Sequence, residues 1–456
     1  MKRIAVPLLL LSLALSTFSC KKAPEGAYNV PVTYYKLGNG LKVVLSEDHT
    51  SPTVVVGVYY NIGFRIEPKD RTGFAHLFEH MMFQGSHNLG KMEFIRLVEK
   101  NGGELNGSTR FDFTNYFELV PSNKLETMLW AEADRMKGLA ITQDNLTNQQ
   151  GVVTNEVKVN VLNTPYGGFP WLDLPQAAFK NWYNAHNFYG DLKDIEAATL
   201  ADVQSFFAKY YAPNNASLVV TGDFDPGSAK SMIEKYFAAI PAVERPPAPD
   251  LTEPRQEERR MVARTDSLAS RPAFAFGYQM PPRFTPDFFA MGLIDQILLQ
   301  GDDAMLRDAL VRKRGWTDAV GGGINAELGN MFDYNGPMLW SGSFIHDASV
   351  TPEAIMAVLD SVTGVLRTRP LDRAVLDRAR VKFRSSLYDQ LAEFVGFGKA
   401  NLLAALALFD DDPGKINTIE DQLAGVTPEQ IQKTAETYLR STNQTVVVLN
   451  TKTNAR

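Results

Sequence analysis

A proline-rich stretch near the middle of this 456-residue chain limits how it can fold. Residues 240–250 contain four prolines, and a charged run, residues 253–260, follows them. Proline lacks the backbone N–H that helices and central strands use, so residues 241–260 are predicted to be a linker. The linker leaves two parts, 28–240 and 261–456, that are similar in length and in the order of their predicted elements. We therefore expect two domains of the same fold.

Each part mixes strand patterns with helical patterns. Residues 32–45 read as two strands joined by a Gly-Asn-Gly turn, and residues 54–61 as a third strand. A helix is predicted to begin near Pro121. The second part opens and closes with strand-like runs, residues 273–278 and 445–449. Because strands and helices do not alternate regularly, we predict an α+β fold in which each domain packs a mostly antiparallel sheet against helices.

The first twenty residues differ from the rest of the chain. Residues 1–3 are Met-Lys-Arg, and residues 4–15 form an apolar run shorter than the ~20 residues that span a bilayer. This pattern predicts an export signal, residues 1–20. Small residues precede Cys20, the only cysteine, as at the processing site of bacterial lipoproteins, although Thr17 stands where leucine is usual. We expect either a periplasmic or outer-membrane-anchored lipoprotein of a bacterium, held to the membrane by lipidated Cys20, or a plain secreted protein.

The composition argues against several classes of function. Hydrophobic residues make up 45% of the chain and charged residues 21%, as in globular proteins and unlike disordered chains or series of membrane spans. The net charge of −6 gives no sign of a basic face. Nucleic acid is therefore not an expected partner.

One five-residue motif, His76-x-x-Glu79-His80, indicates chemistry. On a helix, positions i, i+3 and i+4 lie on one face, so these three side chains project together. Two imidazoles one turn apart can share a zinc ion, and the carboxylate beside them can reach a metal-bound water. The sequence therefore predicts a zinc peptidase with the inverted H-x-x-E-H motif. The alternative is two buried core histidines and an exposed helical glutamate.

Catalytic zinc sites normally have three protein ligands, and Glu156 is the candidate for the third. It lies in a helical segment beside Val152, Val153 and Val157. A carboxylate on an apolar helical face costs free energy unless it is paired or metal-bound. The segment by itself favours a solvated glutamate. The assignment of Glu156 as a zinc ligand therefore depends on the resemblance of other parts of the sequence to a known family.

Several blocks of the sequence resemble the pitrilysin or insulinase family of zinc metallopeptidases. They follow the family's order and comprise residues 38–41, 73–85, 102–116, 152–156, 164–167, 211–216 and 222–225. The resemblance implies that His76, His80 and Glu156 bind one Zn²⁺ per chain. It makes Glu79 the general base that activates the zinc-bound water. It also implies a zinc-dependent endopeptidase that cleaves peptides or unfolded segments in a closed chamber, with this chain forming one half of a clamshell.

The resemblance also indicates where substrate binds. Residues 106–120 alternate like an exposed strand, and the family pattern makes this strand the edge to which an extended peptide adds by backbone pairing. Asn106, Gly107 and Thr109 are the residues that it assigns to substrate binding. The residues alone leave open an ordinary internal strand with a solvated face.

Two departures from the family pattern change the expectations. Gln149 stands where several members have a glutamate that supports a zinc ligand, so it can donate a hydrogen bond but adds no charge. Val311 and Asp318 occupy the places where self-sufficient members have an Arg and a Tyr that bind substrate. Arg271 and Tyr278 have the right separation, but an odd offset in a strand-like run points them to opposite faces.

The missing Arg and Tyr imply a partner. We expect a heterodimer in which a zinc-less subunit of the same fold supplies both residues, whereas a homodimer would lack them. Two other functions stay open: a noncatalytic scaffold subunit, like the core proteins of respiratory complexes, and a surface-anchored peptide-binding lipoprotein with a relic site. The complete set of His76, Glu79, His80 and Glu156 favours the peptidase.

Overall fold

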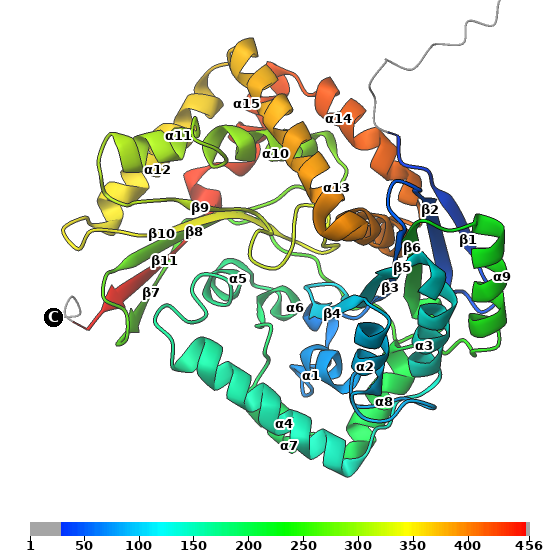
Figure 1. Ribbon diagram of the computed structural model, residues 1–456. Coiled ribbons are helices and arrows are strands. Elements are labelled where there is room, and N and C mark those ends of the chain that lie inside the picture. Colours follow the sequence, from blue (N-terminus) through cyan, green and yellow to red (C-terminus); the bar gives the residue numbers. More distant parts are fainter. Residues whose placement is uncertain (1–28, 453–456) are drawn as a thin grey trace, which may run out of the picture.

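The computed structural model describes residues 29–452, so the predicted export signal and Cys20 lie outside the described residues. The chain forms two sheets that helices cover (Figure 1). The first sheet precedes the linker, and its strands are β1 (Thr33–Lys36), β2 (Lys42–Glu47), β3 (Thr53–Tyr60), β4 (Glu104–Thr109), β5 (Thr114–Pro121) and β6 (Ala216–Gly222). The strands of the second sheet are β7 (Arg260–Asp266), β8 (Ala273–Gln279), β9 (Gly321–Ile324), β10 (Leu339–Ile345) and β11 (Gln444–Thr451).

Helices fill most of the chain between the strands. Those of the first half are α1 (Phe74–Met81), α2 (Glu93–Lys100), α3 (Leu125–Lys137), α4 (Gln143–Val157) with the wider turn η3 (Lys158–Leu162), α5 (Asp173–Ala178), α6 (Trp182–Ala185), α7 (Leu192–Ala197), α8 (Leu200–Tyr210) and α9 (Pro226–Phe237). Those of the second half are α10 (Pro286–Leu298), α11 (Met305–Arg307) with η5 (Asp308–Arg312), α12 (Pro352–Thr368), α13 (Arg373–Asp410), α14 (Ile419–Gly425) and α15 (Pro428–Tyr438).

The two sheets share one strand order. The first runs β1-β2-β6-β3-β5-β4 and the second β7-β11-β8-β10-β9. If β1 is set aside, each sheet places its first strand beside its last and its third strand at one edge. In each sheet one pair is parallel, β2 with β6 and β7 with β11, and the other pairs are antiparallel. The predicted α+β fold with two similar, mostly antiparallel sheets is confirmed.

The two halves interlock through their helices. Helix α13 of the second half lies across the first sheet, where Lys42 Nζ donates to the carbonyls of Ala407 and Leu408 at 2.9 Å. Helix α5 of the first half packs Leu174 against the second sheet, in a small core that includes Ala275. Residues 29–452 therefore form one continuous body.

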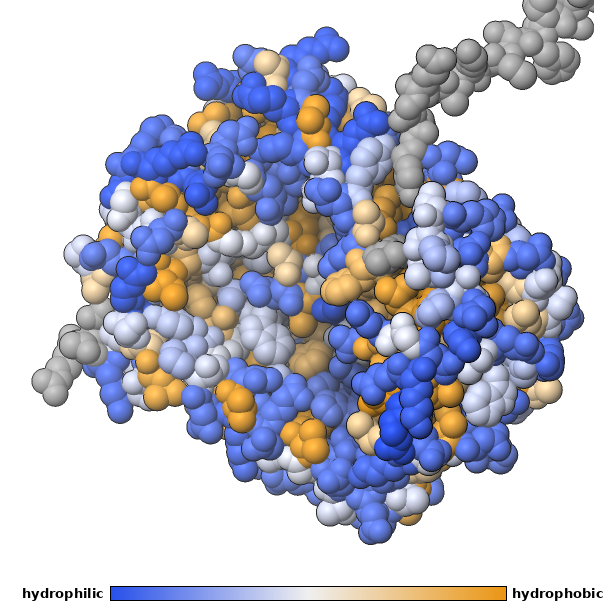
Figure 2. All heavy atoms as spheres, viewed as in Figure 1, coloured by the Kyte–Doolittle hydropathy of each residue, from blue (hydrophilic) through white to orange (hydrophobic). Residues whose placement is uncertain are grey.

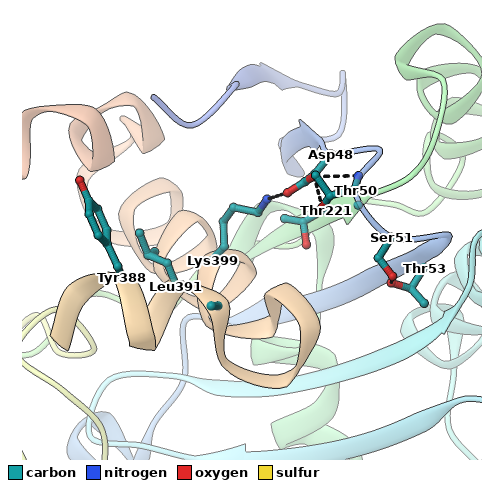
Figure 3. Close-up of a pocket in the computed structure, with 10 residues that line it drawn as sticks. Asp48, Thr50, Ser51, Thr53, Thr221, Tyr388, Leu391 and Lys399 are labelled. Carbon is teal, nitrogen blue, oxygen red and sulfur yellow. Dashed lines mark hydrogen bonds and ion pairs between the residues drawn. The ribbon is translucent and has the colours of Figure 1, made fainter. Parts of the chain in front are cut away.

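A cavity of about 300 Å³ lies where α13 meets the turn between β2 and β3 (Figure 3). Lys399 of α13 is buried, and its Nζ donates to Asp48 Oδ2 at 2.7 Å. This hydrogen bond is the main cause of the low pKa of Asp48, about 2. Thr50 Oγ1 also donates to Asp48, and the Lys399 ammonium and the Asp48 carboxylate neutralise each other. The cavity contains none of the motif residues, and its ion pair ties the two halves together.

Residues 54–61 coincide with β3, and the helix predicted near Pro121 is α3 after one 3₁₀ turn. The prediction of one strand over residues 106–120 is wrong, because β4 and β5 form a hairpin there. Residues 241–259 contain no helix or strand, but the domain boundaries themselves stay a prediction.

A membrane span needs a helix that is both long and strongly apolar, and the helices of residues 29–452 differ from that description. No single helix meets both criteria, although the two arms of the bent α13, Arg373–Phe394 and Phe397–Asp410, meet them together.

Candidate metal centre

The helix that carries the motif starts at an unusual cap. Gly73 precedes α1 with φ of +80°, a conformation that suits glycine. The carboxylate of Glu67, fully buried, accepts hydrogen bonds from the backbone N–H groups of Gly73 and Ala75. These are N–H groups that the first turn of a helix leaves without a helical partner. Glu67 therefore fixes the start of α1 and, with it, the direction of the motif side chains.

The structure brings the three predicted ligands together, two from α1 and one from the neighbouring α4. His76 Nε2 lies 3.2 Å from His80 Nε2. The Glu156 carboxylate lies 3.5 Å from His76 Nε2 and 3.3 Å from His80 Nε2. Ligand atoms arranged tetrahedrally around zinc at 2.0–2.1 Å are about 3.3 Å apart. Within the described part of the chain this is the one group of histidine, cysteine and carboxylate side chains with such spacing.

The local electrostatics keep His76 and Glu156 in the forms that bind metal. Burial is the main cause that lowers the pKa of His76 to about 4, and the neighbouring His80 contributes to the same shift. His76 is thus neutral at pH 7, with a free lone pair. The hydrogen bond to His80 holds the pKa of Glu156 below its usual value, so this carboxylate is ionised. Neutral imidazole and ionised carboxylate are the species that coordinate zinc.

Aromatic side chains orient the ligands. The His76 ring contacts Phe188 and Tyr189, with ring centroids 4.8 and 5.1 Å apart. Tyr189 also donates its hydroxyl proton to Glu156 Oε1 at 3.1 Å. His76 Nδ1 is buried and has no hydrogen-bond partner among residues 29–452. Packing, and not a hydrogen bond to Nδ1, therefore holds this ring. Sequence reasoning missed Tyr189, because it lies 33 residues from Glu156 in a segment with no motif.

Glu79 lies beside the three ligands but points toward β4. Burial raises its pKa above the usual glutamate value, and hydrogen bonds from the side chain and backbone of Thr109 oppose that rise. Thr109 Oγ1 also lies 3.3 Å from the Ala75 carbonyl, to which it can donate. A partly buried carboxylate with a raised pKa at hydrogen-bond distance from a strand is suited to proton transfer at a peptide bound there.

The three residues predicted to bind substrate all lie in β4, the edge strand of the first sheet. The Gly107 N–H donates to its neighbour Asn106 Oδ1 at 2.9 Å, and the Thr109 backbone bonds to Glu79. Both N–H groups therefore point away from β5. They lie on the open side of the sheet, where another strand can pair.

The remaining predicted residues lie outside this cluster. Gln149 is buried on α4, and its amide donates to Asn148 Oδ1 at 2.8 Å, so its support of a zinc ligand stays a prediction. Tyr278 is fully buried and its hydroxyl accepts from Gln444 Nε2, whereas Arg271 pairs with Asp318. Tyr278 is thus unavailable to substrate, and Arg271 with Tyr278 does not form the missing pair.

Two family models match the chain. The model described as "Insulinase (Peptidase family M16)" matches residues 42–166, and "Peptidase M16 inactive domain" matches residues 197–382. Together they cover more than half of the chain. The first match contains α1 with its motif and Glu156, and the second lies mostly in the half without a metal cluster.

Relatives and solved structures agree with these models. Zinc protease PqqE of Helicobacter pylori is 26% identical over 424 residues, 91% of each chain. Four further curated relatives are matched over a fifth to a half of their own length. The crystal structure of a protease from Helicobacter pylori has a TM-score of 0.84 at 23% identity, covering 92% of this chain and all of that one. The periplasmic protease PqqL from Escherichia coli has a TM-score of 0.74 at 16% identity, and the match covers 93% of this chain but 48% of PqqL. At these identities the structures show the fold alone.

Proposed function

The chain belongs to the pitrilysin/insulinase (M16) family of zinc peptidases, and from this premise we propose that it is a zinc-dependent endopeptidase acting on peptides or unfolded segments. One observation carries the proposal: the nitrogens of His76 and His80 and a carboxylate oxygen of Glu156 are spaced 3.2–3.5 Å apart. That spacing suits one tetrahedral zinc ion with a free fourth position, as in catalytic sites. The proposed stoichiometry is one Zn²⁺ per chain.

Each residue of the site has a role in the proposed reaction. Zinc, when bound, supplies a Lewis acid for the scissile carbonyl. The Glu79 carboxylate takes a proton from the attacking water and passes it to the leaving amine nitrogen. β4 holds the peptide as an added strand, whose carbonyls replace Asn106 Oδ1 and the Glu79 carboxylate as the acceptors of the outward N–H groups of Gly107 and Thr109. Tyr189 orients Glu156 through its hydroxyl.

A second subunit is part of the proposal. The match covers 93% of this chain but only 48% of PqqL, and this difference in length supports a second unit beside this chain. Tyr278 is buried, and Val311 and Asp318 cannot replace an Arg and a Tyr. We therefore propose a heterodimer whose zinc-less partner contributes those two residues, with a homodimer as the alternative.

The proposed location is outside the cytoplasm of a bacterium. Two observations support this location. The sequence starts with basic residues and an apolar run, and the similar protein PqqL is named as a periplasmic protease. Anchoring through Cys20 is part of the same proposal. Detergent partitioning of the full-length chain and of Cys20→Ala tests it, because a lipidated Cys20 partitions into detergent and the variant does not.

Cleavage assays test the enzymatic proposal. A quenched peptide pool is incubated with the purified chain, alone and mixed with zinc-less subunits of the same fold, with and without phenanthroline. We expect cleavage that the chelator abolishes and added zinc restores, and a gain in rate with the correct partner. Cleavage that survives complete zinc removal contradicts the proposal, and so does its absence from every zinc-loaded mixture.

A further inference from the structure

The outer edge of the second sheet has no partner strand. β7 lies at the end of that sheet, and β11 pairs with one side of it. No strand of residues 29–452 pairs with the other side, so every second residue of β7 directs its backbone N–H and carbonyl away from the sheet. The ribbon diagram shows β7 at the border of the molecule (Figure 1).

The first sheet covers the corresponding edge with a strand of its own. β2 has in that sheet the place that β7 has in the second, because each pairs in parallel with the last strand of its half. β1 covers β2 in an antiparallel pair, from Thr33 opposite Leu45 to Lys36 opposite Lys42. The free side of β7 is therefore a position that, in the other half of the same chain, an antiparallel strand occupies.

Apolar side chains gather along this free edge. Met261 and Val262 are 52% and 45% exposed, and Leu268, just beyond the strand, is 49% exposed. Ala263 is exposed as well, so three successive residues meet solvent and both faces of the strand are open there. In the space-filling view, hydrophobic residues reach the surface at the lower left, near the border that β7 forms in the ribbon diagram (Figure 2). An edge strand with exposed apolar side chains is a ready site for pairing with another chain.

The sequence of β7 is complementary to a second copy of itself. An antiparallel pair centred on Ala263 includes all seven residues of β7 and places Arg260 of each copy opposite Asp266 of the other. Opposite charges that face each other stabilise such a pair, and like charges destabilise it. A pair centred on Val262 or on Arg264 sets arginine against arginine and is shorter by two residues. Charge and length therefore favour the same register, centred on Ala263.

Neither charge of the facing pair is neutralised within residues 29–452. Arg260 donates to backbone carbonyls of α5, and Asp266 accepts hydrogen bonds from backbone N–H groups. Neither side chain has a salt-bridge partner in this part of the chain. Arg264 differs, because it pairs with Asp173 and needs no further partner. Two of the four charge positions that face each other across the pair thus gain a counterion from the second copy.

We propose that β7 pairs with β7 of a second copy of this chain, antiparallel and centred on Ala263, so that the two five-stranded sheets become continuous. The contact contains no residue of the metal centre or of β4, so it does not depend on the proposed function. It is a second contact beside the one proposed with a zinc-less partner. A pair of seven-residue strands buries less surface than the ~1,200 Å² of a stable interface, so the dimer should be reversible, with a Kd in the micromolar range.

Analytical ultracentrifugation tests the dimer directly. The full-length Cys20→Ala chain, which carries no lipid anchor, is measured between about 1 and 100 μM, where a micromolar dimer dissociates on dilution. Ala263→Glu sets two like charges face to face at the centre of the pair and should weaken the dimer at least about fivefold. Val381→Glu is the matched control, because Val381 is 68% exposed on α13 and outside β7. A monomer at every concentration, or a dimer that Ala263→Glu leaves unchanged, overturns the inference.

Cysteine cross-linking tests the register. Facing residues of an antiparallel pair have Cα atoms ~4.5–5.5 Å apart, within the range that a disulfide needs. In the Cys20→Ala chain, Ala263→Cys should therefore form an interchain disulfide with itself. Met261→Cys should form one only when it is mixed with Thr265→Cys, because these two positions face each other in the proposed register. Met261→Cys that cross-links with itself, while Ala263→Cys does not, overturns the register.

The same variants distinguish a second copy from other occupants of the edge. A chain that stays monomeric, but whose Ala263→Cys variant cross-links to a different protein in cell extracts, assigns the edge to that protein and overturns the inference. A dimer without the Ala263→Cys cross-link uses another surface and overturns it too. Thermal unfolding shows whether Ala263→Glu folds, and if it does not, the cross-linking pattern alone decides.

Discussion

Glu79 differs from the neighbouring histidines in what it contacts. His76 and His80 point toward Glu156, whereas Glu79 bonds to Thr109 of β4. The spacing of the motif predicted that the three side chains lie on one helical face, but it did not predict the hydrogen bonds between Glu79 and Thr109. Tyr189 and Glu67 were not predictable. Their contacts with Glu156 and with the start of α1 depend on how distant segments fold back, and their neighbours in the sequence carry no pattern.

Replacing Glu79 with glutamine separates metal binding from proton transfer. Glutamine keeps the size of the side chain but cannot accept the proton, so Glu79→Gln should retain zinc and lose at least about a hundredfold in turnover. Elemental analysis and peptide cleavage measure the two effects. Glu99→Gln, an exposed substitution on α2, should change neither. Substantial turnover in Glu79→Gln would exclude Glu79 as the general base.

A second prediction at this scale concerns pH and stability. Asp295 is buried in the second half and accepts a hydrogen bond from Trp340 Nε1 at 2.7 Å. Burial raises its pKa to about 7. Because the unfolded chain releases this proton near pH 4, the folded state binds the extra proton between pH 4 and 7. Stability from this group therefore falls as pH rises through that window, by about 4 kcal/mol in all.

Thermal unfolding at pH 5 and pH 8 measures this effect. Asp295→Asn removes the titrating group but keeps an oxygen acceptor for Trp340, so its Tm should fall less between the two pH values than that of the wild type. Asp389→Asn, exposed on α13, is the control and should behave as the wild type. Parallel pH profiles for wild type and Asp295→Asn would contradict the assignment.

At the scale of elements, periodicity predicted several strands and the helix near Pro121 but not the hairpin of β4 and β5. The turn between these strands is Arg110-Phe-Asp-Phe113, which contains no glycine, proline or asparagine. Alternation of polar and apolar residues continues on both sides of it, so the pattern read as one strand. The structure places β4 at the edge, and in this position the N–H groups of the proposed substrate site point away from the sheet.

Peptides with N-methyl groups test strand addition at β4. Backbone N–H groups of an added strand pair at every second residue, so methylation should weaken cleavage with a period of two. We expect about a tenfold loss at pairing positions near the cut and little loss one residue away, where the N–H points to solvent. The alternate positions serve as the internal control. A uniform loss, or none, would exclude binding as an added strand.

At the scale of the whole molecule, the two sheets repeat one topology, as the similar element order of the two parts predicted. The interlocking of the halves was not predictable. The Lys42 contacts with α13 join residues more than 360 positions apart, and no local pattern reports them. Arg65 is a second such link. It is fully buried, lies 2.8 Å from Asp112, and donates to Asn184 Oδ1 and the Pro337 carbonyl.

Removing the Arg65 charge should destabilise the whole molecule. Arg65→Met keeps most of the stem but leaves Asp112 buried without its cation, which should lower the free energy of unfolding by about 3–5 kcal/mol. Denaturant unfolding measures the change. Arg71→Met removes a partly exposed pair with Asp202 and should cost less than about 1 kcal/mol. Equal small losses in both variants would show that Arg65 does not hold the halves together.

The central claim is that His76, His80 and Glu156 bind one zinc ion, and metal content tests it most directly. Elemental analysis is applied to wild type and to Glu156→Gln, both exposed to zinc and then desalted. The account predicts about one zinc per wild-type chain and a large loss in Glu156→Gln. Wild type without zinc, or Glu156→Gln with full zinc content, would contradict it.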